Sequence, residues 1–129
     1  MKFSVDKHEK YVVLRLDECR LTAENAPGLK SEFILLHADG YRNIVLDLSK
    51  VTACDDSQDL SCLLVGDRIC KGAGGIFIVT HITGCISRLL DISSIDQSLN
   101  IAGNLSEAED LIFMEEIEKE LLGSFDQEI

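Results

Sequence analysis

The chain has 129 residues, of which 46% are hydrophobic and 27% are charged, and its formal net charge is −11. These values are typical of one globular domain with a single core and not of a disordered chain. The charge argues against a nucleic-acid-binding protein, which needs clusters of Lys and Arg to neutralise phosphates. It also argues against adhesion to an anionic membrane surface, whereas a basic protein partner is compatible with it.

The apolar runs and the cysteines indicate the compartment. No apolar run approaches the ~20 residues that a membrane span needs, and no signal-peptide pattern opens the sequence. The five cysteines are odd in number and contain no C-x-x-C pair, so we expect reduced, buried thiols and no metal site. The sequence therefore predicts a cytoplasmic protein without a cofactor.

The first half of the chain predicts a hairpin, a helix and a buried strand. Apolar residues alternate at 2–5 and 11–16 around a polar turn, as in a β-hairpin. A loop through Thr22 leads to Pro27, which is placed as a first-turn helical proline, and Asp39-Gly40 ends that helix. The apolar run at 44–48 predicts a central strand.

The second half continues the alternation of helices and strands. Residues 60–72 have helical spacing, and the apolar run 76–79 between glycines is typical of a strand covered on both faces. A helix at 83–90, capped by Thr83, and a weak strand at 98–101 follow. The last helix is predicted to begin with a capping box of Ser106 and Glu109 and to end in a frayed tail at 123–129. Its predicted apolar face consists of Ala108, Leu111, Ile112, Ile117, Leu121 and Leu122.

These elements have the order β-β-α-β-α-β-α-β-α and form one domain over residues 1–122. Alternation of buried strands with amphipathic helices predicts an α/β fold with a mixed sheet flanked by helices. Its parallel strands should be joined by right-handed crossovers.

The segment from Asn43 to Leu60 is the most informative part of the sequence. It predicts a buried strand, an acidic turn and then a helix that begins at Ser57. A helix start has unpaired N–H groups and the positive end of the macrodipole, so it suits a small polar cap or an anion. Ser57 is therefore either an ordinary cap or the acceptor of a phosphate that switches a partner on or off.

The element order and this segment resemble the STAS family, the anti-anti-sigma factor domain. The strand from Ile44 and the turn before Leu60 are similar to the family's strand and its Asp-Ser-Ser-Gly-Leu motif. Gly74-Gly75 before a strand and the run 86–93 are also similar to family motifs. The resemblance implies a non-enzymatic regulator that binds an anti-sigma factor, itself a serine kinase of the histidine-kinase-like ATPase type. Phosphorylation of the motif serine abolishes this binding, and a phosphatase restores it.

Two registers of the motif are open. Counted from the strand, Asp55 matches the motif aspartate and Asp56 falls on the phosphorylated serine, so that a permanent carboxylate would lock the domain in one state. Counted back from the helix, Asp56 and Ser57 match Asp-Ser, and Ser57 is the phosphoacceptor. A third possibility is that Asp55, Asp56 and Ser57 only cap the helix. The motif glycine is replaced by Gln58 or Asp59, according to the register.

The resemblance predicts a switch turn at Asp55, Asp56 and Ser57, beside a docking surface of Thr22, Gln58, Asp59 and Ser61. An alternative is a scaffold of the same fold that assembles with other proteins of a signalling complex without phosphorylation. No enzyme is predicted, because His8, His37 and His81 lack triad partners by spacing.

Two further residue groups have structural interpretations. Asp47 is predicted to be a strand-end residue paired with a loop amide. The glutamates of the last helix suggest a solvated face, while Phe113 and Met114 lie off its predicted core stripe and could form a homodimer contact or a docking patch.

Overall fold

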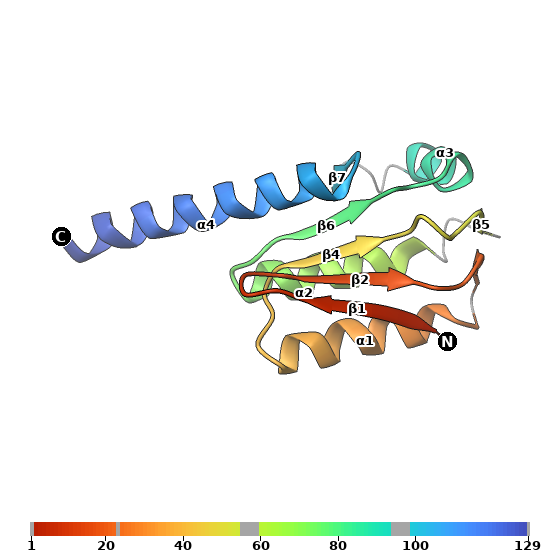
Figure 1. Cartoon of the computed structure of the whole chain (residues 1–129), viewed down its shortest axis with the longest axis horizontal. Coiled ribbons are helices and arrows are strands. Elements are labelled where there is room, and N and C mark those ends of the chain that lie inside the picture. Colours follow the sequence, from red (N-terminus) through yellow and green to blue (C-terminus); the bar gives the residue numbers. More distant parts are fainter. Residues whose placement is uncertain (1, 23, 55–59, 94–98, 129) are drawn as a thin grey trace.

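A five-stranded mixed sheet lies at the centre of the molecule (Figure 1). A computed structural model describes residues 2–22, 24–54, 60–93 and 99–128. The strand order is β1-β2-β4-β6-β7, with β1 antiparallel to β2 and all other neighbours parallel. The strands are β1 (Phe3–Lys7), β2 (Val12–Leu16), β4 (Ile44–Asp47), β6 (Phe77–Thr80) and β7 (Asn100–Ala102). The predicted α/β fold with a mixed sheet is thus confirmed.

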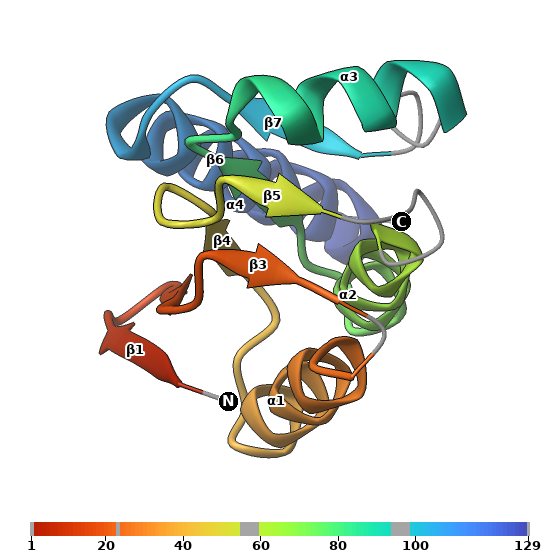
Figure 2. The ribbon, with the colours of Figure 1, turned by 90° about the vertical axis from the view of Figure 1, so that its right-hand side faces the viewer.

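Helices cover both faces of this sheet. They are α1 (Ala26–Ala38), α2 (Cys62–Gly72), α3 (Gly84–Ser93) and α4 (Leu105–Glu128). Helices α1 and α2 lie on one face and α4 on the other, as Figures 1 and 2 show together. None of the helices in the described ranges combines the length and the apolar character that a bilayer-spanning segment requires.

The two central strands are apolar on both faces because each faces a helix layer on either side. In β4, Ile44 and Leu46 belong to the core under α1 and α2, while Val45 belongs to the core under α4. Phe77 of β6 meets Phe33 of α1 edge to face, with ring centroids 5.2 Å apart. This explains the continuous apolar runs in the sequence.

A second, two-stranded sheet was not predicted. β3 (Arg20–Leu21) pairs in parallel with β5 (Ala53–Cys54). Strands of two residues have no alternation that a pattern search can detect, and their pairing is fixed by long-range contacts instead.

A buried polar cluster connects α4 to the sheet. Asn43 is 1% exposed, and its amide nitrogen donates to the Lys10 carbonyl oxygen at 2.9 Å and to Glu116 Oε1 at 2.7 Å. Its side-chain oxygen accepts from the Ile76 amide at 3.0 Å. Hydrogen bonds from Arg42 and, to a smaller extent, from Asn43 lower the pKa of Glu116, so its carboxylate stays charged inside the protein.

The predicted apolar face of α4 is wrong in its second half. Ala108 and Ile112 are buried as expected, but Leu111, Ile117 and Leu121 are exposed. The position one turn beyond Ile112 is occupied by Glu116, which is buried because Arg42 and Asn43 satisfy its charge. The side chain of Leu122 lies outside the described part of the chain.

The start of α4 differs from the sequence prediction. The helix is capped by Asn104, whose Oδ1 accepts from the Glu107 amide at 2.9 Å, while Glu107 Oε2 accepts from the Gly103 amide at 2.7 Å. This pair replaces the predicted box of Ser106 and Glu109, since Asn caps a helix as well as Ser does. The helix runs to Glu128, and the fraying of the tail at 123–129 stays a prediction.

A close backbone approach requires glycine where α2 turns into β6. A Cβ atom at Gly75 would lie 1.8 Å from the carbonyl oxygen of Arg42, whereas a Cβ at Gly72 would meet no atom within 4 Å. The Gly75 amide also donates to the Cys70 carbonyl oxygen at 2.7 Å. Gly75 therefore allows the turn to pack against the residue next to Asn43.

We predict that Asn43→Ala lowers the free energy of unfolding by about 2–4 kcal/mol, because the Ile76 amide and the Glu116 carboxylate lose a buried partner. Urea denaturation of the purified variant measures this loss. Asn100→Ala is the matched control, since that side chain is half-buried and makes only a 3.4 Å bond to the Phe77 carbonyl oxygen. Equal losses in the two variants would contradict the role given to Asn43.

We also predict that Gly75→Ala destabilises the protein by roughly 3 kcal/mol, because the Arg42 backbone would have to move. Gly72→Ala should be neutral or stabilising by up to ~1 kcal/mol, since its new methyl group points into open space in a helix. Thermal unfolding of both variants tests the pair. A Gly75→Ala protein as stable as the wild type would show that the close approach is absent.

Candidate functional site

The predicted switch turn joins β5 to α2. Asp55, Asp56, Ser57, Gln58 and Asp59 all lie outside the described residues, so their geometry stays a prediction. The structure does describe the elements on either side of them. These elements determine where the turn begins and ends.

The small sheet brings two distant loops together at the entry to the turn. Leu21 pairs with Cys54, and the amides of Thr52 and Ala53 both donate to the Cys19 carbonyl oxygen, at 2.9 and 3.2 Å. Figure 2 shows β3 and β5 side by side at this end of the molecule. Thr22 therefore directly follows the residue that is paired with Cys54, the last described residue before the turn.

Thr22 also contacts the start of α1, whose N-cap is Asn25. Asn25 Oδ1 accepts from the Thr22 amide at 2.7 Å, and the Ala26 amide donates to the Thr22 carbonyl oxygen at 2.9 Å. The Asn25 side chain donates in turn to the carbonyl oxygen of Arg20 at 2.7 Å. These bonds join β3 to the helix and leave the half-buried Thr22 side chain at the rim of the predicted docking surface.

Helix α2 begins later than the sequence predicts. Ser61 is the residue before its first α-helical position, Cys62, and the helix was expected to begin at Ser57. Leu60 and Ser61 form part of a 3₁₀ turn, a common way to enter an α-helix, and Leu60 is fully buried. Ser61 is exposed at the start of α2, on the far side of the turn from β5.

A row of polar side chains lies across the strand ends on the α4 face of the sheet. In register, Ser4 is opposite Arg15, Arg15 is opposite Asp47, and Asp47 is opposite Thr80. Two residues earlier along these strands, the same face carries the apolar residues Val13 and Val45, which pack in the core under α4. The row marks the part of the face beyond α4.

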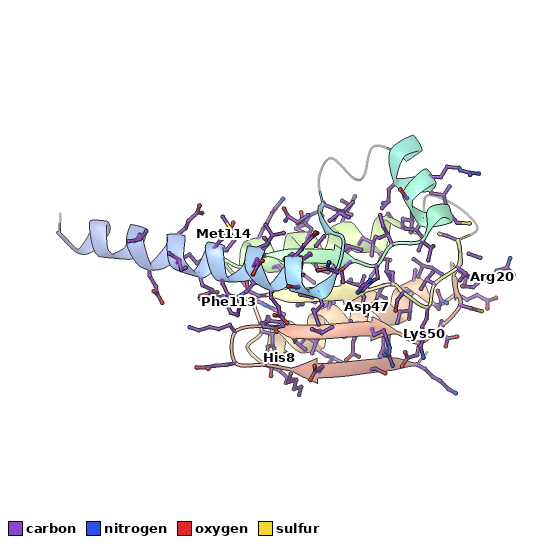
Figure 3. The ribbon with its side chains drawn as sticks, turned by 45° about the horizontal axis from the view of Figure 1, so that its top comes forward. His8, Arg20, Asp47, Lys50, Phe113 and Met114 are labelled. Atoms are coloured by element: carbon purple, nitrogen blue, oxygen red, sulfur yellow. The ribbon has the colours of Figure 1, made fainter. Side chains whose placement is uncertain are left out.

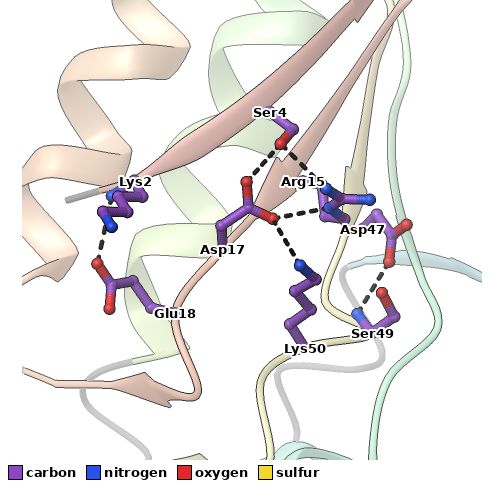
Figure 4. Close-up of polar contacts among 8 residues, drawn as sticks. All are labelled: Lys2, Ser4, Arg15, Asp17, Glu18, Asp47, Ser49 and Lys50. Atoms are coloured by element: carbon purple, nitrogen blue, oxygen red, sulfur yellow. Dashed lines mark hydrogen bonds and ion pairs between the residues drawn. The ribbon is translucent and has the colours of Figure 1, made fainter.

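An ion-pair network holds part of this row (Figure 4). Asp17 accepts hydrogen bonds from the Ser4 hydroxyl and from Arg15 Nε, and Lys50 Nζ lies 3.7 Å from its Oδ1. The hydrogen bond from Ser4 and then that from Arg15 lower the pKa of Asp17. Sequence reasoning missed this network; the cross-strand pairing of Ser4 with Arg15 is the signal that could have suggested it.

Asp47 has the predicted role. Its Oδ1 accepts from the Ser49 amide at 2.8 Å, so the carboxylate closes the turn that follows β4. Figure 3 places Asp47, Lys50 and Arg20 towards one end of the molecule and His8, Phe113 and Met114 away from it.

The two kinds of chemical site to consider in the described ranges are a metal site and a reactive cysteine thiol. There, no three His, Cys, Asp or Glu side chains gather as a metal site would require. Burial raises the pKa of Cys70 to about 12, which keeps its thiol unreactive. Cys62 is buried as expected, but Cys19 and Cys85 are exposed, so the expectation of buried thiols is wrong for these two.

Neither a protein-family model nor a curated protein matches the sequence. Solved structures do match. A structure of a Thermotoga maritima protein that is assigned as an anti-sigma factor antagonist has a TM-score of 0.74 at 26% identity, over 85% of this chain and 93% of that one. An anti-sigma-factor antagonist (STAS) domain protein from Planctomyces limnophilus has a TM-score of 0.71 at 18% identity, over 82% and 93% of the two chains.

The chain has the STAS-domain fold. The anti-sigma factor antagonist SpoIIAA in its unphosphorylated form is also similar, with a TM-score of 0.70 at 16% identity over 86% of this chain and 96% of that one. SpoIIAA in its phosphorylated form gives a TM-score of 0.63. The resemblance that the sequence indicated is therefore confirmed at the level of the fold, over most of this chain.

The Asp17 network should make the stability of the STAS domain depend on pH. Because the folded-state pKa of Asp17 lies below its ordinary value of 3.8, the network stabilises the fold above that value. The stabilisation is lost as the pH falls through the lowered pKa. We predict that Asp17→Asn is less stable than the wild type at neutral pH and that the difference narrows as the pH falls below 3.8.

Urea midpoints of both proteins across this pH range measure the effect. Asp110→Asn is the control, because Asp110 is an exposed carboxylate on α4. A constant difference between Asp17→Asn and the wild type at every pH would contradict the prediction.

Proposed function

We propose that this STAS domain is a protein-binding regulator of transcription similar to anti-sigma factor antagonists, and that phosphorylation of Ser57 switches it. The observation that carries the proposal is the likeness to the Thermotoga maritima anti-sigma factor antagonist over most of both chains. The motif-like sequence Asp55-Asp56-Ser57 between β5 and α2 supports it further.

Phosphorylation would act through charge at a docking surface. A phosphoserine adds about −1.5 to −2 charges at pH 7. The helix dipole of α2, which begins at Cys62, falls off within one turn and is worth roughly 0.3–1 kcal/mol, so it would offset only part of this charge. The carboxylates of Asp55, Asp56 and Asp59, which are close to Ser57 in the sequence, repel the added phosphate charge. The added charge therefore alters the contact with a partner more than it alters the fold.

The partner that fits this proposal is an anti-sigma factor that is also a serine kinase of the histidine-kinase-like ATPase type. A phosphatase would reverse the modification. That SpoIIAA exists in an unphosphorylated and a phosphorylated form supports such a cycle for this chain. The contact surface would comprise the turn residues Gln58 and Asp59 with Thr22 and Ser61 on either side.

In the other register of the motif, Asp56 takes the place of the phosphoacceptor and locks the domain in one state. A scaffold role without phosphorylation would follow from the same register. Ser57→Ala and Asp56→Ser distinguish these possibilities, because each changes only one candidate position.

We predict that incubation with native cell extract and ATP adds one phosphate to the wild type, at Ser57, and none to Ser57→Ala. Tandem mass spectrometry locates the phosphate. Ser106→Ala is the matched control and should be phosphorylated like the wild type, since Ser106 is an exposed serine on α4 and does not belong to the proposed contact surface. An unmodified Ser57 in the wild type, in an extract that phosphorylates Asp56→Ser, would refute the switch at Ser57 and establish the locked register.

A further inference from the structure

Helix α4 is apolar on two opposite sides. Its inner side carries Ala108 and Ile112 towards the sheet. Its outer side carries Met114, Ile117 and Leu121, which are 60%, 56% and 58% exposed. Residues spaced three and four apart lie on one face of a helix, so these three side chains form a continuous stripe directed away from the core.

One end of the stripe is continuous with the body of the domain. Phe113 is 45% exposed and meets the Tyr11 ring edge to face, with centroids 6.4 Å apart. The Tyr11 hydroxyl donates to Glu109 Oε1 at 2.8 Å, and the His8 ring stacks on Tyr11 at 4.4 Å. From there α4 continues past the sheet (Figure 1). The outer face is therefore presented on a helix whose first turns are firmly packed.

The residues beside the stripe are acidic. Residues 105–121 contain seven Asp and Glu and one Lys. The lysine, Lys119, lies on the inner side, since its Nζ would be 3.5 Å from a Cβ atom at Gly74. Asp110 and Glu118 are exposed and lie on the same side of the helix as the stripe. The outer face thus combines an apolar centre with a negative rim.

We propose that this outer face binds an amphipathic helix of another protein, with an apolar stripe flanked by Lys and Arg. Exposed apolar patches with a polar rim mark interaction sites, and the opposite charge of the rims steers and orients the partner. A second copy of this chain is disfavoured, because it would bring another acidic rim and a net charge of −11 to the interface.

The outer face of α4 lies away from the strand that enters the predicted switch turn. Phe113 and Met114 lie away from the end of the molecule that holds Arg20, Lys50 and the strand β5 leading into the turn (Figure 3). A partner on α4 would leave β5, the described entry to the turn, uncovered. The binding of a helix on α4 does not depend on phosphorylation. A failure of this proposal would therefore leave the proposed switch at Ser57 intact, and the reverse also holds.

The probe is a synthetic amphipathic helix of about 18 residues, built of Leu and Lys, with a Leu and Glu peptide of the same pattern as its counterpart. We predict that the Lys peptide binds, less tightly as salt is added, and that the Glu peptide does not. Backbone amide shifts of the labelled full chain should change along the outer side of α4. Ile117→Ser and Glu118→Lys should each weaken binding roughly tenfold.

The matched control is Ile34→Ser on α1, since Ile34 has the same 56% exposure as Ile117 but lies on a different helix. It should bind the Lys peptide like the wild type, and unfolding curves check that each variant is folded. Equal affinity of Ile117→Ser and the wild type, or shift changes confined to another surface, would overturn the proposal. A wild-type dimer in sedimentation equilibrium that Ile117→Ser dissociates would overturn it in favour of self-association.

Discussion

The position of β4 between two parallel neighbours and two helix layers is the constraint on which the rest of the structure depends. A strand that is apolar on both faces loses little burial when it slips by one residue, so its hydrophobic pattern specifies the register weakly. Asn43 supplies the missing specification, because its side chain binds the backbone that enters β2 and the backbone that enters β6. Its bond to Glu116 extends the same registration to α4. From this position β4 leads through β5 to Cys54, the last described residue before the predicted switch turn.

Most of the fold could be predicted because the main elements carry periodic signals. The hairpin, the buried runs at β4 and β6 and the helices α1 and α2 follow from alternation, apolar continuity and helical spacing. The inner face of α4 could not be predicted in full, because Glu116 is buried through partners at 42 and 43 that are far away in the sequence. The strands β3 and β5 could not be predicted because two residues are too few to show a pattern.

The candidate site, like the fold, has one part that the sequence predicts and another that depends on tertiary contacts. The family-like motif identified the turn at 55–57 and its neighbours Thr22 and Ser61, and the pairing of β3 with β5 explains physically why Thr22 lies near the entry to that turn. The network of Ser4, Arg15 and Asp17 depends on cross-strand register, which the sequence alone does not determine. The motif thus identifies where a partner is expected, and the tertiary structure adds the charged surroundings.

Both outer strands of the sheet resist pairing with another chain. β7 is only three residues long, and β1 carries Asp6 and Lys7 towards its exposed end. Short or charged edges of this kind prevent a foreign strand from extending a sheet. Recognition by this domain is therefore expected to go through side chains on loops and helices more than through the addition of a strand to the five-stranded sheet. A partner has to match this surface residue by residue.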